Sequence, residues 1–338
     1  MKYKDLFLAT TALLALTACS SDSQTSGAEE LPVELKLTSR LSGAQTRGTL
    51  DTDADITRLQ GNQIASGETV YAWVEDNSGT AATPYINAWQ LTAKGDGTLE
   101  GTKQYYPPTG NNVDVYCLHG NFAAAPSGAF PSTALTHTVM ADQSTAANYA
   151  KSDLLYGSVQ NQGRKEKQPV VFKHKLAKIE VKLKAGAGVT AAQLTNAATK
   201  VMVTGTLPTA TYTPAKAAAL EEGGSIASYG GTVTASGTAA DISMYLQKDN
   251  SDGATIVVFG EAIIVPQTIS AAANFFKIHI SDGGDLFAKL GGTESKVFEA
   301  GKKYTYTITV NLSGITLTSS ITEWTDGSGD DLNADIDS

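Results

Sequence analysis

The clearest chemical signal in the sequence surrounds Cys19, which ends the segment Leu16-Thr17-Ala18-Cys19. Lys2 and Lys4 come first, followed by an apolar run over residues 6–16 that is too short to span a bilayer as a folded helix. A hydrophobic residue and small residues before a cysteine form a lipobox, which marks the cysteine for acylation and the bond before it for cleavage. We therefore predict a signal peptide at residues 1–18 and a lipid, palmitate included, on Cys19.

The lipid also predicts where the protein goes. Several acyl chains on one residue anchor a protein far more stably than a single chain does. Ser20 stands where an aspartate would favour retention in the inner membrane, and a polar tether follows it. We expect a surface-exposed lipoprotein in the outer membrane of a Gram-negative cell.

Other residues capable of chemistry are isolated along the chain. The four histidines have no metal-ligand spacing, and a lone histidine on a strand is usually packed or at an edge. The acidic tail resembles a calcium loop, but Asp331 stands where the sharp turn needs glycine. Three tryptophans are candidates for a sugar platform, although strand aromatics more often form core. We predict no catalytic residue, no metal and no cofactor, so the protein is not expected to be an enzyme. The histidines and tryptophans considered are His119, His137, His174, His279, Trp73, Trp89 and Trp324.

Charge and cysteine usage narrow the classes further. The formal net charge is −9, and the last 16 residues contain six acids and no base, which argues against nucleic acid as a partner. Cys117 is the only cysteine besides Cys19. With Cys19 lipidated, no intrachain disulfide is available, so the fold must rest on its hydrophobic cores.

Short alternating runs separated by Gly, Asn, Asp and Pro predict an all-β fold of antiparallel sandwiches. In residues 175–184, Ala177 and every second residue after it are apolar, and the intervening lysines and glutamate predict a solvated face. Phe172, His174 and Leu176 have the opposite parity, which predicts a bulge or a change of sheet near Leu176. Helices are expected only near 144–150 and 190–196, and the hydrophilic stretch 161–169 is the predicted domain boundary.

The two ends of the chain resemble each other. Val33, Leu35 and Leu37 alternate with polar residues, which is typical of a strand with one buried face. Near the C-terminus, Ile315, Leu317 and Ile321 share one parity, and a weaker alternation follows at Leu332, Ala334 and Ile336. Either C-terminal segment fits a groove shaped for the leading strand, which would be β-strand addition between chains.

The order of several segments resembles the fimbrillin family of type V pili. They are the lipobox, the leading strand, Thr46-Arg47, SDLLYG at 152–157, FKHKLAKIEVKL at 172–183, VPQTI at 265–269, FEAGKKYTYTITV at 298–310 and ITEW at 321–324. The resemblance implies two tandem transthyretin-like antiparallel β-sandwich domains, here at 48–168 and 169–338, after a lipidated propeptide at 19–47. It also implies that an arginine-specific protease cuts between Arg47 and Gly48 and removes the leading strand.

The same resemblance implies a structural and adhesive pilus subunit. The groove left by the removed strand would accept the C-terminal strand of another subunit, with Ile315, Leu317, Ile321, Leu332 and Ile336 as donor candidates. Stalk subunits of the family usually end in a more apolar strand than DLNADIDS, which leaves open whether this is a stalk, tip or anchor subunit. The partners implied are other pilus subunits, the protease, the outer membrane and a host glycan or protein.

An alternative from a different class is a monomeric adhesin or glycan-binding lipoprotein that keeps its leading strand and its lipid. Arg40 and Arg58 are competing cleavage sites, although Arg40 ends the strand and Arg58 lies deeper in the sequence. The loop around Arg47 favours cleavage there, because exposed loops rich in small residues are where nicking occurs.

Overall fold

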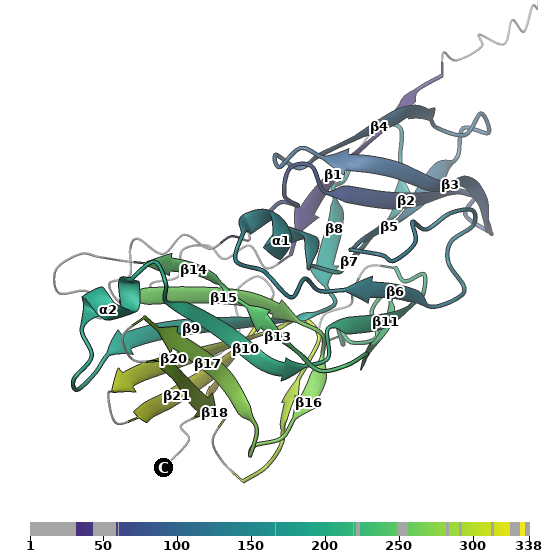
Figure 1. Ribbon diagram of the computed structural model, residues 1–338. Helices are drawn as coiled ribbons and strands as arrows, with labels where there is room; N and C mark the ends of the chain where they lie inside the picture. Colours follow the sequence, from purple (N-terminus) through teal and green to yellow (C-terminus); the bar gives the residue numbers. More distant parts are fainter. Residues whose placement is uncertain are drawn as a thin grey trace, which may run out of the picture. The chain divides into compact units, whose positions relative to one another are not determined.

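Alternation of apolar and polar residues produces strands throughout the part of the chain that the computed structural model describes. That part comprises residues 32–42, 59, 61–165, 167–218, 220, 224–248, 256–281, 284–290, 293–311, 314–324 and 332–334. Within it the secondary structure is almost entirely β, so the predicted all-β class is confirmed (Figure 1). Val33–Ser338 form one compact unit.

Seven strands close into a barrel. Their order around the barrel is β1 (Glu34–Leu41), β4 (Thr98–Tyr105), β3 (Ala82–Ala93), β2 (Thr69–Asn77), β5 (Asn112–His119), β7 (Leu155–Gln162) and β8 (Val170–His174). The ring is completed where β8 pairs with β1. A closed barrel removes the free edges of its sheet, so each strand in it has a partner on both sides.

A six-stranded sheet forms the centre of the rest of the molecule. Its order is β14 (Tyr245–Lys248), β15 (Val258–Ile264), β9 (Ala177–Ala185), β20 (Lys302–Asn311), β21 (Gly314–Glu323) and β22 (Leu332–Ala334). The pairings of both sheets are antiparallel except for β1 with β8 and β9 with β20, which are parallel. Each parallel pair joins strands separated by a long stretch of chain, as parallel connections require.

Three smaller sheets complete the β structure of the described residues. One has the order β13 (Ala240–Ser243), β10 (Lys200–Thr206), β17 (Asn274–Ile280) and β18 (Gly284–Lys289); another has β12 (Gly231–Ser236), β11 (Thr209–Pro214) and β6 (Leu135–Thr138); the last pairs β16 (Gln267–Ile269) with β19 (Lys296–Phe298).

The two helices of the described residues are short and capped. α1 (Ala146–Lys151) begins after Thr145, whose side chain accepts from the Asn148 N–H. α2 (Ala191–Thr195) begins with a capping box between Thr190 and Gln193. Each cap supplies acceptors to backbone N–H groups that lack a partner inside the helix. Both helices lie where the sequence predicts them. No helix in the described residues is long and apolar enough to cross a membrane.

The buried apolar side chains form two cores. One fills the barrel, and the other lies among the remaining sheets and also takes in Trp73, Tyr116 and Tyr156 from barrel strands. The Tyr156 hydroxyl donates to the Ala217 carbonyl at 3.0 Å, and Lys216 forms an ion pair with Glu75 of β2. The barrel therefore contacts the later sheets through both apolar and charged side chains.

The predicted change of sheet near Leu176 is confirmed, because β8 belongs to the barrel and β9 to the six-stranded sheet. The linking residue Lys175 is fully buried, and its Nζ donates to the carbonyls of Ile226 and Tyr229 at 2.5 Å and of Gly231 at 3.0 Å. Burial lowers the pKa of Lys175 to about 7. The chain thus passes from the barrel to the six-stranded sheet at Lys175, and the hydrogen bonds of this side chain hold the turn at residues 226–231 against the crossing.

The predicted solvated face of β9 is wrong. Lys178 and Glu180 are each 1% exposed, and Lys178 Nζ lies 2.6 Å from Glu261 Oε1 and 3.1 Å from Glu180 Oε1. The segment containing α1 covers this face, with Tyr149 buried and the Gln143 amide bonded to both the N–H and the C=O of Ile263. The face is charged but dry. Burial alone would lower the pKa of Lys178, but Glu261 and Glu180 outweigh it and raise the pKa.

Candidate functional site: the groove filled by the leading strand

β1 fills a groove between two strands that do not pair with each other. It runs antiparallel to β4, with Leu37 opposite Leu99, and parallel to β8, with Leu41 opposite Phe172. The ladder with β4 is interrupted by a bulge between Leu35 and Leu37. Without β1, the barrel would have two unpaired edges over an open core.

Alternate side chains of β1 enter the barrel core. Leu35, Leu37 and Leu41 are 2%, 1% and 2% exposed, whereas Lys36 and Arg40 point to solvent. This is the one-sided strand that the alternation predicts. Val33 lies just before the strand and is half-buried, and its carbonyl accepts from the Tyr106 N–H at 2.9 Å. The buried row therefore begins at Leu35, two residues later than the sequence pattern suggests, and runs to Leu41.

One buried position of β1 is polar. Ser39 is 4% exposed, and both its N–H and its Oγ donate to the Gly97 carbonyl, at 2.7 and 3.2 Å. Gly97 has φ +93°, and a Cβ there would come within 3.0 Å of the Ser39 carbonyl oxygen. Only glycine meets both conditions easily. The groove thus has a polar contact with one position of the strand it holds, which sequence reasoning missed because nothing local links Ser39 to Gly97.

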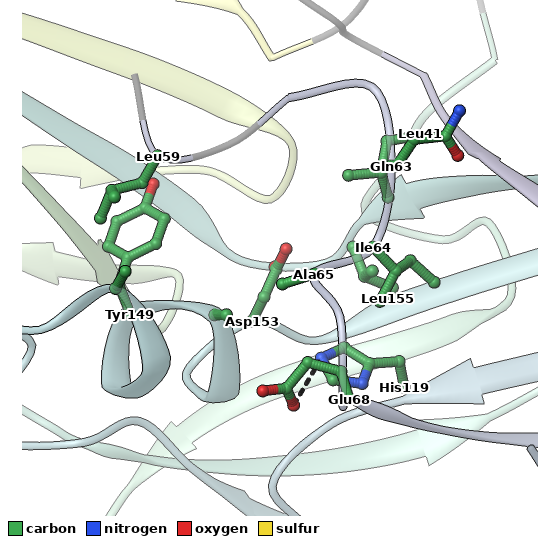
Figure 2. A pocket seen from close by; sticks show the side chains of 12 residues that line it. Leu41, Leu59, Gln63, Ile64, Ala65, Glu68, His119, Tyr149, Asp153 and Leu155 are labelled. Carbon is green, nitrogen blue, oxygen red and sulfur yellow. Dashed lines mark ion pairs between the residues drawn. The ribbon is translucent and has the colours of Figure 1, made fainter. Parts of the chain in front are cut away.

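A small cavity of about 90 Å³ lies at the Leu41 end of the groove (Figure 2). Tyr149 and Leu59 lie on one side of it, and Leu41, Ile64 and Leu155 lie on the other. The Tyr149 hydroxyl is buried and has no hydrogen-bond partner among the described residues, and burial raises its pKa well above the ordinary value. The cavity is lined mainly by apolar side chains, with Leu41 of β1 among them.

Three of the polar side chains around this cavity have partners, namely Glu68, His119 and Asp153. His119 Nε2 lies 4.0 Å from Glu68 Oε2, the pair dashed in Figure 2, and its Nδ1 lies 2.8 Å from the Thr69 carbonyl oxygen. Asp153 Oδ2 lies 2.9 Å from His174 Nδ1. These contacts join the side chains of His119 and Asp153 to neighbouring parts of the fold.

The other residues considered for chemistry are buried or contact a neighbouring side chain. His137 is fully buried, where burial lowers its pKa to about 4, and His279 contacts Asp285 at the surface. Cys117 is a buried free thiol whose pKa is raised by burial. In the described residues no group of three or more His, Cys, Asp or Glu is placed to hold a metal ion.

The tryptophans do not form an exposed platform. Trp73, Trp89 and Trp324 are 2%, 6% and 3% exposed. Trp324 stacks on His174 of β8, with ring centroids 3.7 Å apart and an interplanar angle of 2°, and its backbone N–H donates to the Gly301 carbonyl at 2.7 Å. The end of β21 is therefore fixed against a strand that borders the groove.

The C-terminal candidates lie on the six-stranded sheet. β21 pairs along its whole length with β20, and β22 pairs with Ser319–Ile321 on the other side. Leu317 and Ile321 are half-buried against the core, and Ile315 and Leu332 are placed here by their strand positions. Cys19, Arg47, Gly48 and Ile336 lie outside the described residues.

Together these observations define an all-β protein whose prominent site is a strand-filled groove. The chain belongs to the fimbrillin-like family, whose model matches residues 57–324. The resemblance drawn from the sequence is thereby confirmed.

Individual relatives agree with this assignment. A Bacteroides uniformis protein named as fimbrium subunit Fim1C is 29% identical over 181 residues, which are 52% of this chain and 52% of that protein. The alignment thus spans about half the length of that relative. Two crystal structures described as cell adhesion proteins share the fold. The one from Bacteroides uniformis is 21% identical, with a TM-score of 0.55 over 90% of this chain and 100% of that chain. The one from Bacteroides ovatus is 16% identical, with a TM-score of 0.56 over 87% and 97%.

Proposed function

We propose that this protein is a structural and adhesive subunit of a surface fimbria. It would be exported as a lipoprotein, activated by removal of β1 and polymerised by strand exchange. The observation that carries the proposal is that β1 alone fills the groove between β4 and β8. A strand near the chain's start can be cut off without interrupting any other strand of the barrel.

The attached strand would be hard to displace. Its three buried leucines, Leu35, Leu37 and Leu41, contribute roughly 1.5 to 3 kcal/mol each. Because it is tethered, its effective concentration at the groove is on the order of millimolar. A free donor strand could not compete until the tether is cut. Cleavage therefore supplies a switch from a stable monomer to a subunit that needs a partner.

The proposed cut lies between Arg47 and Gly48, after β1 has ended. Arg40 is exposed but lies within β1, with its backbone opposite Val171 of β8. A protease binds an extended, unpaired segment, so cleavage at Arg40 would require β1 to leave first. This difference supports Arg47 over Arg40.

After cleavage the contact between subunits would be heterologous. The groove of one subunit would hold a C-terminal segment of the next, either around Ile315, Leu317 and Ile321 or around Leu332 and Ile336. Such a contact does not close on itself, so it propagates a filament. The partners proposed are other pilus subunits, an arginine-specific protease and a host glycan or protein, with the lipid on Cys19 holding the precursor in the outer membrane.

The division into two sandwich domains remains part of the proposal. β8 follows the hydrophilic stretch at 161–169 and still pairs within the barrel. This supports a boundary at Lys175 and Leu176, between β8 and β9, in place of one at residue 168.

A permanently anchored adhesin is the second candidate. The complete barrel, with β1 paired on both sides, is what such a monomer would keep. Tyr85 and Tyr105, on β3 and β4, are 38% and 40% exposed and offer aromatic surface to a ligand such as a glycan.

The test is to treat the lipid-free precursor with an arginine-specific protease and follow its intact mass and its elution by size exclusion. We expect a chain beginning at Gly48 and ladders or filaments from the cut protein. Arg47→Ala should stay intact and monomeric, and Arg40→Ala should behave like the wild type. A cut protein that stays monomeric would favour the anchored adhesin.

A further inference from the structure

Lys178, Glu180 and Glu261 form a group of charges inside the six-stranded sheet that the proposed function does not use. Their exposed fractions are 1%, 1% and 0%. Burying such charges costs free energy, and replacing a whole buried ion group by apolar side chains is often neutral or stabilising. Stability alone therefore does not account for their presence in the core.

The register of the sheet places the amine of Lys178 against the carboxyl group of Glu261. β15 pairs antiparallel with β9, with Ile263 opposite Lys178 and Glu261 opposite Glu180. Lys178 and Glu261 are thus diagonal neighbours on one face, a spacing that long side chains span. Nζ lies 2.6 Å from Glu261 Oε1, so it is within about 4 Å of the carboxyl carbon bonded to that oxygen. A nucleophile attacks from a similar separation.

The second carboxyl oxygen of Glu261 has a hydrogen-bond donor of its own. The Leu59 N–H donates to Glu261 Oε2 at 3.0 Å. Attack on the carboxyl carbon develops negative charge on this oxygen, and a fixed backbone N–H stabilises such charge. Oε1, on the side of the amine, is then the oxygen that leaves.

Glu180 is placed to carry protons. Its Oε1 lies 3.1 Å from Lys178 Nζ, within reach of a proton on the ammonium group, and the Thr305 hydroxyl donates to its Oε2 at 3.3 Å. The two carboxylates raise the pKa of Lys178, so the resting side chain is charged. Transfer of one proton to Glu180 leaves a neutral amine, and burial favours the neutral forms of both groups.

We propose that Lys178 and Glu261 join in an amide bond that links β9 to β15 within one chain. Nζ attacks the carboxyl carbon of Glu261, a C–N bond forms, and the bond from that carbon to Oε1 breaks. The ammonium group gives up two protons, which Glu180 passes to the departing oxygen, so that oxygen leaves as water. One proton stays on the amide nitrogen, and Glu180 ends as the carboxylate it was at the start. The step consumes no other reactant.

The dry surroundings favour the amide over the ion pair. The reaction replaces two buried charges by one neutral group, and the product water is released to solvent. The pair Lys94 and Glu100 provides a comparison within the same chain. Its atoms are 2.8 Å apart, but its side chains are 43% and 61% exposed. Water stabilises the charges of this surface pair, so we expect it to stay ionic.

The bond has a mechanical consequence. Residues 178 and 261 enclose β10, β11, β12, β13 and β14 along the chain. Tension applied between the barrel and β21 would pass through the amide bond and leave the enclosed strands unloaded. This benefit to a fimbria rests on the proposed function, whereas formation of the bond does not, because it needs only the folded monomer.

The experiment is mass spectrometry of the purified, full-length, lipid-free chain, denatured in urea after incubation for several days at neutral pH. The intact mass should lie below the sequence mass by one water, about 18 Da. Ring closure at an Asp-Gly pair such as Asp252-Gly253 also removes one water, so tryptic digestion must locate the change. The linked product is residues 176–182 joined to residues 249–277, because a modified Lys178 is no longer a cleavage site.

We expect the linked peptides from the wild type, with Lys94 and Glu100 unlinked in the same digest. Full intact mass with free peptides 179–182 and 249–277 would overturn the proposal. Loss of water without the linked peptides would overturn it as well. Filament formation is followed separately, so a negative result here leaves strand exchange standing, and a monomeric but linked chain leaves the bond standing.

Two variants test the chemistry. Glu180→Gln keeps one positive and one negative charge, so it should fold, and its linked fraction should fall by about tenfold or more because the proton carrier is gone. Glu261→Gln should form the same bond with ammonia leaving in place of water, giving linked peptides of the same mass as the wild type. A linked fraction unchanged in Glu180→Gln would overturn the role of Glu180.

Discussion

The barrel around β1 and the six-stranded sheet that ends in β21 and β22 hold similar strands in different ways. β1 has a partner strand on each side, and its aliphatic side chains are almost completely buried. β21 has a full partner in β20 and, among the described residues, the three residues of β22 on its other side, and its Leu317 and Ile321 side chains are half-buried. Two strands with a similar pattern of aliphatic residues are therefore buried to different extents, β1 more completely than β21.

The two regions also differ in what fills their interiors. The side chains of β1 that enter the barrel are Leu35, Leu37, Ser39 and Leu41, whereas buried titratable side chains of the barrel lie on other strands, among them Glu75 of β2 and His119 of β5. The six-stranded sheet buries Lys178 with Glu180 and Glu261 on the face that α1 covers. Apolar burial tolerates the replacement of one strand by a similar one, whereas a buried ion cluster fixes particular partners. The interior around β1 therefore places fewer demands on the particular strand that fills it than the interior around β9 does.

The largest effect should come from the buried charges. Lys178→Met leaves two carboxylates in the core without their cation, and we expect a loss of about 3 to 5 kcal/mol in the free energy of unfolding. Urea denaturation measures it. Lys36→Met, on the exposed face of β1, is the matched control and should change stability by less than about 0.5 kcal/mol. A small effect of Lys178→Met would mean that the sheet is not held by this cluster.

The second-largest loss of stability should come from shortening a buried side chain of the leading strand. Leu37→Ala in the uncut precursor opens a cavity in the barrel core, with an expected loss of about 2 to 5 kcal/mol. The denaturation midpoint, read together with the circular dichroism of the folded state, reports the change. A barrel that tolerates Leu37→Ala without loss would not depend on β1, and the contrast between the two strands would disappear.

Acid should act through His137 on β6. Its Nδ1 accepts from the Asn121 N–H and its Nε2 contacts the Ser152 carbonyl, whereas His119 and His174 of the barrel have carboxylates beside them. Burial lowers the pKa of His137 from 6.5 to about 4, so the unfolded chain binds more protons in that window. We expect stability to fall as pH drops from about 6.5 to 4, by about 2 kcal/mol at pH 5.

The readout for His137 is the slope of stability against pH. His137→Gln should remove most of that slope between pH 6.5 and 4, whatever it does to the absolute stability. His279→Gln, at the exposed contact with Asp285, should leave the slope unchanged. An unchanged slope in His137→Gln would assign the acid sensitivity to other groups.

The smallest effect is expected in β21, which lies between β20 and the short edge strand β22. Leu317→Ala removes a half-buried side chain, and about 1 kcal/mol should be lost from the free energy of unfolding of the uncut precursor. Comparison with Leu37→Ala in the same assay tests the contrast directly, because both changes remove the same atoms from matching sequence positions. Equal losses would show that β21 is held as firmly as β1.

Several features of the fold could be predicted from local pattern. The alternation in β1, the all-β class, the two short helices and the change of sheet near Leu176 follow from periodicity and capping residues, which act over a few neighbours. The polar face of β9 was predicted to be solvated and is buried, because a period of two distinguishes the faces of a strand but does not say what covers them. The α1 segment that covers this face comes from an earlier part of the chain.

The sequence by itself determined the strand pattern and the likeness to fimbrillins, and it predicted the lipobox at Cys19, because each depends on residue types at short spacing. Only the tertiary structure decided that β1 closes a barrel against β8, that Ser39 has the Gly97 carbonyl as its partner and that Lys178 is buried with two glutamates. These contacts join residues far apart in the sequence, and their geometry exists only once the sheets have formed and packed.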